Sequence, residues 1–200
     1  CFGTEHSIIY QVRFENHAFK CPVFKFVSDN TILYSAKQKY NEVFISEGAD
    51  IHIRNRKSHV CYILQNETTK TNKVRIGDNV FEIKYIGSGN VNHYSLRVTF
   101  TNKGKTLTWI PKQPRFDPKT EKYYLNFHGE YHHTPILSSR NMVLQNNANQ
   151  TTFIVRRMDQ RVFEIECLPD IEPLLAFIIG LSDIIGPYLD PWANNGTDLL

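Results

Sequence analysis

Two basic residues, Lys73 and Arg75, are the clearest candidates for binding chemistry in this sequence. They stand two positions apart in a stretch that reads as a β-strand from Lys73 to Ile76. Residues two apart in a strand project from the same face, so the spacing predicts that the two cations act together. A mobile ammonium and a planar guanidinium both suit phosphate oxygens. The alternative interpretation is an ordinary solvated strand face.

The chain around these two residues is strongly basic. Residues 50–105 carry ten Lys or Arg and four Asp or Glu, whereas residues 159–200 carry one basic residue and eight acids. The middle of the chain is therefore the candidate anion-binding region. Arg54, Arg56 and Lys57 form an auxiliary basic patch, which would add about 1 kcal/mol of attraction per residue near an anionic membrane. The alternative for this patch is a polar hairpin tip.

Patterns for catalysis or metal binding are weak. His128, His132 and His133 have no cysteine or carboxylate at a metal-ligand spacing. Glu164 and Glu166 share a strand face but alternate with apolar residues, so we expect both carboxylates to face solvent. The sequence has no nucleophile-elbow, phosphate-loop or dinucleotide-binding pattern. We therefore expect a protein that is not an enzyme, with no catalytic residues, metal or cofactor.

The elements that must position the basic residues are mostly short strands. From residue 7 to residue 167, apolar and polar residues alternate between turn signals such as Asn102-Lys103-Gly104. In Val162–Cys167, for example, the apolar residues mark one face and the two glutamates the other. A strand is also expected at Ile51–Arg54. The pattern predicts roughly a dozen antiparallel strands.

One stretch near the C-terminal end predicts a helix, at about residues 171–185. Asp170 is a candidate N-cap, Pro173 falls in the first turn, and Gly186-Pro187 is a stop signal. Residues 174–181 are apolar at every position, so this helix must be buried on all sides. At roughly 22 Å it is too short to span a bilayer of about 30 Å. Its expected core residues are Leu174, Phe177, Ile178 and Leu181.

A closed sheet around the helix satisfies both predictions, because closure removes the sheet edges and covers the whole helix. The rival architecture, a two-layer sheet with the helix on one face, would leave half of the apolar helix in water. The sequence therefore favours a mainly β (α+β) fold: a closed antiparallel barrel of about twelve strands around a central hydrophobic helix. Residues 1–200 are expected to form a single domain, with a tail at residues 188–200.

The composition is that of a globular chain, with 41% hydrophobic and 22% charged residues. The four cysteines are scattered without a C-x-x-C pair, so we expect reduced, buried thiols rather than disulfides. The chain begins with Cys1 rather than Met, and we expect it to be a fragment of a longer protein. The cysteines are Cys1, Cys21, Cys61 and Cys167.

Several motifs toward the C-terminal end resemble the C-terminal domain of the tubby family. The run Tyr123-Tyr124-Leu125-Asn126-Phe127-His128-Gly129 is similar to the family signature Y-x-L-N-F-H-G-R, with Glu130 in place of the arginine. The run at residues 138–142 resembles S-V-K-N-F, and residues 112–117 resemble the family's N-K-x-P-x-W-N. Residues 173–182 look like the family's apolar helix. These pieces follow the family's order and cover the last third of the chain closely.

The resemblance implies a closed barrel around a central helix that binds phosphoinositides, notably phosphatidylinositol 4,5-bisphosphate. Lys73-Val74-Arg75 matches the family's K-L-R headgroup run, and the asparagine that assists it there falls at His59 or Cys61 here. The implied location is the cytoplasm, peripheral at the plasma membrane, with the nucleus as a second location. Release would follow lipid hydrolysis or dephosphorylation. Protein partners would bind through a region preceding this chain.

Two other functions stay open at this point. Phospholipid scramblases and LURP-one-related proteins share the barrel, so the first alternative is such a barrel without specific headgroup binding. The second is a protein-interaction or DNA-binding scaffold, because aromatic residues lie among the charges of the basic region. Aromatic residues at strand spacing are more often part of a core. The four concerned are Tyr62, Phe81, Tyr85 and Tyr94.

Overall fold

The structure is a computed structural model that describes residues 7–15, 22–39, 42–49, 59–66, 71–76, 79–87, 94–102, 105–125, 127, 136, 138 and 140–186. These residues form fourteen strands and one helix. The strands are β1 Ile8–Glu15, β2 Val23–Ser28, β3 Thr31–Lys39, β4 Glu42–Glu47, β5 His59–Asn66, β6 Thr71–Ile76, β7 Asn79–Gly87, β8 Tyr94–Asn102, β9 Lys105–Pro111, β10 Arg115–Asp117, β11 Lys122–Tyr124, β12 Met142–Gln145, β13 Thr151–Arg157 and β14 Val162–Cys167. The helix, α1, runs from Pro173 to Ile185.

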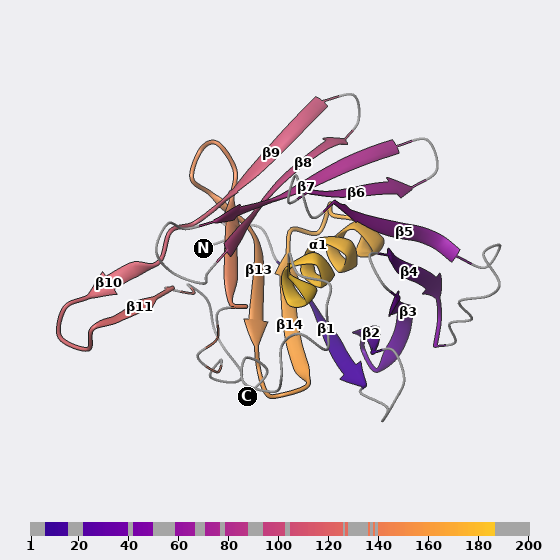
Figure 1. The fold of residues 1–200 in the computed structure, drawn as a ribbon, viewed down its shortest axis with the longest axis horizontal. Helices are drawn as coiled ribbons and strands as arrows, with labels where there is room; N and C mark the ends of the chain where they lie inside the picture. The colour runs from indigo at the N-terminus through magenta and orange to yellow at the C-terminus, as the bar shows by residue number, and fades with distance from the viewer. Residues whose placement is uncertain are drawn as a thin grey trace.

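Twelve of the strands form one closed antiparallel barrel, in the order β1-β14-β13-β12-β9-β8-β7-β6-β5-β4-β3-β2, with β2 pairing β1 to close the ring. The other two, β10 and β11, form a small two-stranded sheet that projects from the barrel (Figure 1). The predicted closed barrel of about twelve strands is confirmed, and the two-layer alternative is wrong. The strand expected at Ile51–Arg54 lies outside the described residues.

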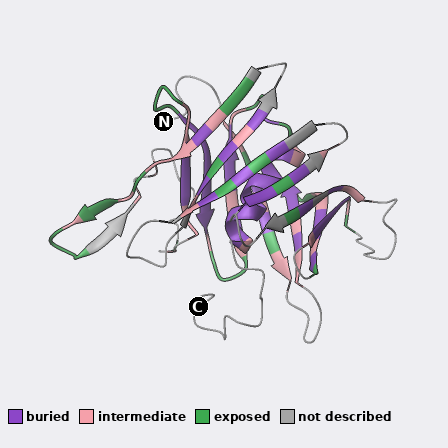
Figure 2. Cartoon of the chain, turned by 45° about the horizontal axis from the view of Figure 1, so that its top comes forward, coloured by how far each residue is buried: buried purple, intermediate pink, exposed green. Residues whose placement is uncertain are grey.

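The helix α1 lies inside the barrel and is buried at every position from Leu175 to Ile184. Its contacts come from widely separated strands of the ring. The Phe177 ring stacks on Phe26 of β2, with 4.9 Å between ring centroids, while Ser182 accepts a hydrogen bond from Asn72 of β6. Figure 2 shows the buried helix within the strands. A helix that is apolar all round is thereby covered all round, as the sequence predicts.

The two ends of α1 differ in how well the sequence predicts them. The N-cap is Glu172, which makes no side-chain cap hydrogen bond, and the helix begins at Pro173. The prediction of Asp170 as N-cap, with a start near residue 171, is therefore wrong; proline at the first helical position supplies the start because it needs no N–H partner. Gly186, with φ of 81°, ends the helix and its N–H donates to the Ser182 carbonyl. This predicted stop is confirmed.

Three of the four predicted core residues of α1 are confirmed, because Phe177, Ile178 and Leu181 are fully buried. The fourth, Leu174 in the first turn, is only partly buried and packs against the core. Among the residues described, no helix is long and apolar enough to cross a membrane. The tail at residues 188–200 lies outside the described residues.

Gly180 explains how the helix and the barrel wall come so close. A Cβ atom at this position would lie 2.1 Å from Ile165 Cδ1 on β14. Glycine in a helix interior normally costs about 0.5–1 kcal/mol relative to alanine. Close packing offsets this cost here, because the absence of a side chain lets the helix backbone contact Ile165.

Two of the four cysteines lie in the core. Cys61 and Cys167 are buried thiols that belong to no disulfide in the described part of the chain, as predicted. Burial raises the pKa of both thiols to about 12, so neither forms a reactive thiolate near neutral pH. Cys1 and Cys21 lie outside the described residues.

On the outer face of β13 and β14, the prediction that Glu164 and Glu166 both face solvent is wrong for Glu166. Glu166 is only 8% exposed, and it pairs with Arg156 of β13, which is itself buried. Ser7 Oγ also donates to Glu166 Oε1 at 2.6 Å, and the Arg156 guanidinium lies 5.9 Å from the Phe127 ring centroid. Glu166 is therefore not solvated, because a buried arginine requires a carboxylate partner. Glu164 is half-buried.

Truncating the helix at Phe177 should strongly destabilise the barrel. Phe177→Ala is expected to lower the free energy of unfolding by about 3–5 kcal/mol, since the cavity left in a closed core cannot collapse. Denaturant titration checks this value. Phe116→Ala is the matched control, because Phe116 on β10 is exposed and its loss should cost less than about 0.5 kcal/mol. Equal effects of the two changes would contradict the buried-helix architecture.

Candidate functional site

The candidate headgroup residues lie on β6, in the middle of the barrel wall between β5 and β7. The inward residues of this strand, Asn72 and Val74, are buried, while Lys73 between them is exposed. Lys73 therefore projects from the outer face of the barrel. Arg75 pairs through its backbone with Tyr62 and Val80, and its side chain is not among those described. Arg54, Arg56 and Lys57 lie outside the described residues.

Of the two residues at the position of the family's asparagine, Cys61 offers no donor on this face. Cys61 is 2% exposed and belongs to the core cluster inside the barrel, so it cannot reach a ligand outside. His59 is half-buried, and its ring lies 4.9 Å from that of Phe44. Cys61 therefore cannot take the role of the family's asparagine in a headgroup site on β6.

The neighbours of Lys73 across the sheet are an acid and an apolar residue. Lys73 lies directly opposite Glu82 of β7 and Leu64 of β5, and all three side chains are exposed. Opposite charges at directly paired positions attract, although no contact short enough for an ion pair forms between them in the described part of the chain. The acid at this position would oppose a phosphate group bound at Lys73.

One step along the same face, two cations lie directly opposite each other. Lys84 of β7 pairs with Arg97 of β8, and both are exposed. Lys73, Glu82, Lys84 and Arg97 together make what we call the outer β6–β8 face, with a net charge of +2. Sequence reasoning did not select Lys84 and Arg97. The alternation of polar and apolar residues could have predicted that each of the two side chains faces outward. Only the pairing of β7 with β8 shows that they lie opposite each other.

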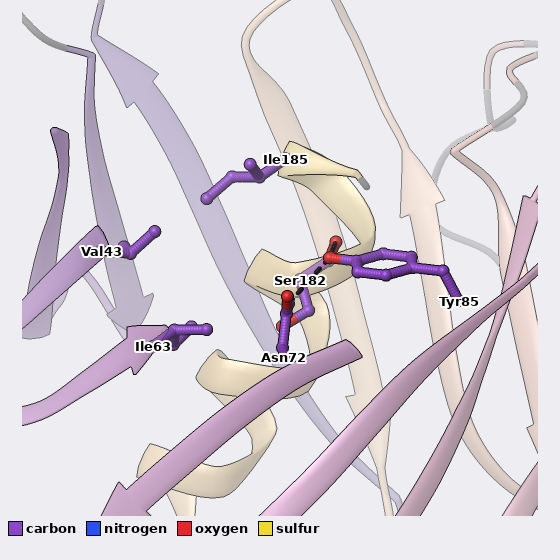
Figure 3. A pocket seen from close by; sticks show the side chains of 6 residues that line it. All are labelled: Val43, Ile63, Asn72, Tyr85, Ser182 and Ile185. Atoms are coloured by element: carbon purple, nitrogen blue, oxygen red, sulfur yellow. Dashed lines mark hydrogen bonds between the residues drawn. The ribbon is translucent and has the colours of Figure 1, made fainter. Parts of the chain in front are cut away.

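Directly behind this face, a buried polar cluster ties β6 and β7 to the helix. Asn72 Nδ2 donates to the Tyr85 hydroxyl at 2.8 Å and to Ser182 Oγ at 3.2 Å, and the Tyr85 hydroxyl donates to the Ser182 carbonyl at 2.9 Å. Figure 3 shows the three side chains meeting at the last turns of α1. These bonds hold the strand that carries Lys73 in a defined position relative to the helix.

A small cavity lies beside this cluster. Its volume is about 10 Å³, and it is enclosed by apolar side chains together with the polar cluster. That is about the space for one water molecule, far too small for a lipid headgroup or an acyl chain. The residues lining it are Val43, Ile63, Asn72, Tyr85, Ser182 and Ile185.

Asp183 is a buried carboxyl next to this cluster on α1, 2% exposed. Its burial raises the pKa to about 8, and the charge of Arg140 offsets only part of that effect. The raised pKa follows from desolvation, because a carboxylate loses its hydration inside the barrel. The carboxyl is therefore mainly protonated at neutral pH.

The other candidates from the sequence do not form a site in the described part of the chain. No three His, Cys, Asp or Glu residues lie close enough to hold a metal ion within it, and the three histidines of interest, with Asn126 and Gly129, lie outside it. Phe127 is half-buried, and its ring lies beside the Arg156 guanidinium on the outside of β13.

No known protein-family model matches this sequence, and no curated protein is significantly similar to it. The likeness to the tubby family is therefore a resemblance carried by the motifs quoted above, and membership of that family is not established.

Replacing Asp183 should change how stability depends on pH. Between about pH 4 and about pH 8 the folded chain holds a proton that the unfolded chain has released, so stability falls as the pH rises through this window. Asp183→Asn cannot ionise, and we expect it to be more stable than the unmodified chain at the upper end of the window. Unfolding titrations at several pH values measure the slope.

Asp170→Asn is the control for this experiment, because Asp170 is exposed and its replacement should leave the slope unchanged. If Asp183→Asn had the same pH dependence as the unmodified chain, the carboxyl would not be the proton-holding group.

Proposed function

We propose that this chain is a non-catalytic phosphoinositide-binding module that tethers its protein reversibly to membranes. The headgroups would be of the phosphatidylinositol 4,5-bisphosphate kind. The observation that carries the proposal is the exposed Lys73 on the outer face of β6, in a closed barrel around a helix. The resemblance to tubby-like domains implies a headgroup-binding run at these residues in this kind of barrel.

The packing of the barrel supports binding on its outside. The helix α1 fills the lumen, and the cavity beside it has room for about one water. That cavity has no room for a charged headgroup, whose desolvation there would also be costly. The outer β6–β8 face offers net positive charge in contact with solvent. Multivalent contact with headgroup phosphates is the binding mode that this arrangement favours.

The proposal includes a location and a mode of release. Phosphoinositides at the cytoplasmic leaflet of the plasma membrane would hold the protein there, because that leaflet carries a negative surface potential. Hydrolysis or dephosphorylation of the lipid would remove the phosphates that Lys73 and Arg75 contact, and so release the protein. Protein partners bound through a preceding region, and a nuclear pool, are consistent with this scheme.

A nucleic-acid scaffold receives less support from the side chains. Single strands are bound by aromatic rings exposed for base stacking. Phe81 and Tyr85, two of the four aromatics in the basic region, are buried in the barrel. The side chains of Tyr62 and Tyr94 are not among those described.

A barrel without headgroup specificity is the stronger alternative. The observation that favours it is Glu82, which lies directly opposite Lys73 and would repel a phosphate there. In that case the face would attract anionic membranes only through general charge.

The double change Lys73→Ala with Arg75→Ala separates these functions. We expect at least tenfold weaker binding to liposomes containing the bisphosphate lipid, because each charge-assisted contact contributes about 1.5–3 kcal/mol. The melting temperature should hardly change, since exposed substitutions usually fall within about 0.5 kcal/mol. Liposome co-sedimentation and a melting curve measure the two quantities.

Charge-matched phosphatidylserine liposomes are the lipid control. They should show a smaller loss, because Arg54, Arg56 and Lys57 still attract the surface. An equal loss on both lipids would reduce the site to a nonspecific basic patch, and no loss on either would refute it.

A further inference from the structure

We propose that Lys84 and Arg97 form a second phosphate-binding position on the outer β6–β8 face, so that one lipid headgroup is held across three strands. This inference rests on the proposed function and names further contacts for it. It differs from the Lys73 and Arg75 pair in that sequence spacing gives no hint of it: Lys84 and Arg97 are thirteen positions apart, and the register of β7 and β8 joins them.

The pairing of Lys84 with Arg97 is unfavourable in the absence of a ligand. Directly opposite side chains in an antiparallel sheet have their Cβ atoms about 4.5–5.5 Å apart, and like charges at that separation destabilise the pair. Both residues are exposed, and neither forms an ion pair within the part of the chain that is described. A phosphate between them would replace repulsion with two attractive contacts.

The position of Lys73 makes the three cations one group. Lys73 lies opposite Glu82, and Lys84 is two residues beyond Glu82 on the same strand and face. Lys73 and Lys84 are therefore diagonal neighbours, about 7–8 Å apart at their Cα atoms. Flexible lysine side chains cover that separation easily. A ligand with two phosphates can thus contact Lys73 with one and the Lys84–Arg97 pair with the other.

Glu82 decides where on this face the phosphates bind. It is the one acid of the outer β6–β8 face, and it lies next to Lys73 across the strands. Its charge weakens a phosphate contact at Lys73 and leaves the Lys84–Arg97 pair as the more positive position. The ligand chemistry that fits is a headgroup with at least two phosphates, presented by a membrane, since a single phosphate would occupy only one of the two positions.

The test compares three variants by co-sedimentation with liposomes that contain phosphatidylinositol 4,5-bisphosphate. Lys84→Gln with Arg97→Gln should weaken binding at least about tenfold, because two charge-assisted contacts are lost. Glu82→Gln should strengthen binding about two- to fivefold, because a repulsive charge is removed. Arg115→Gln with Lys119→Gln removes the same charge from exposed positions on the projecting β10–β11 hairpin and its turn (Figure 1), and should leave binding nearly unchanged.

Stability provides the check on folding. Without ligand, the Lys84→Gln, Arg97→Gln variant should melt no lower than the unmodified chain, because the like-charge repulsion is relieved. Soluble inositol trisphosphate should compete with liposomes for the unmodified chain. A higher concentration of it should be needed to release the Lys84→Gln, Arg97→Gln variant from the liposomes. Competition of this kind attributes the contacts to the headgroup rather than to the membrane surface as a whole.

The outcomes separate this inference from the function on which it rests. Unchanged binding by Lys84→Gln with Arg97→Gln, alongside weak binding by Lys73→Ala with Arg75→Ala, would overturn the second position and leave the proposed function standing. An equal loss of the Lys84→Gln, Arg97→Gln variant on phosphatidylserine liposomes would also overturn it. Loss of binding only in the Lys84→Gln, Arg97→Gln variant would support the second position and make it the main site. No loss in either double variant would refute both.

Discussion

The complete burial of the apolar helix α1 is the constraint on which the rest of this structure depends. A 13-residue helix without a polar face has to be covered on every side, and a closed ring of strands is the arrangement that covers it and leaves no sheet edge exposed. The contacts confirm this from both sides: Phe177 stacks on Phe26, and Gly180 allows Ile165 to touch the helix backbone. Because apolar area removed from water contributes roughly 25 cal/mol per Å², a helix buried all round is a large part of the folding free energy.

Filling the lumen in this way moves any ligand chemistry to the outer surface. The barrel holds its own C-terminal helix where other barrels hold a ligand, and the cavity beside Asn72, Tyr85 and Ser182 has a volume of about 10 Å³. A strand of the wall can then have one face toward the helix and the other toward solvent, although β13 is buried along its whole length. On β6 this division is seen between adjacent residues: Asn72 bonds to Ser182 of the helix, and Lys73 next to it faces solvent. The same strand, β6, thus carries both a contact to the buried helix and a charged side chain on the outer surface.

Several buried polar groups of the interior are paired with one another. Asn72, Tyr85 and Ser182 form hydrogen bonds with one another, and Arg156 is paired with Glu166, because a buried polar group without a partner costs about 1–3 kcal/mol. The cluster is not fully satisfied, since Asn72 Oδ1 has no hydrogen-bond partner. For Asp183, the cost of burial is lowered by protonation instead of by a partner of opposite charge. Its pKa rises to about 8, so that it enters the core as a neutral acid. These groups lie on the helix, on the inner faces of β6 and β7 and at β13–β14, and none of them belongs to the exposed outer β6–β8 face.

The sequence by itself determined the fold class, because all-round apolarity of residues 174–181 and strand alternation each depend only on local periodicity. It also predicted Lys73 as an outward residue. It did not determine the start of α1, where a proline rather than the Asp170 side chain sets the first turn, nor the burial of Glu166, which depends on Arg156 across the sheet. The pairing of Lys84 with Arg97 and of Lys73 with Glu82 was decided only by tertiary structure. Alternation gives the face of each side chain, whereas the partner opposite it depends on the hydrogen-bond register between strands, and closure of the whole barrel sets that register.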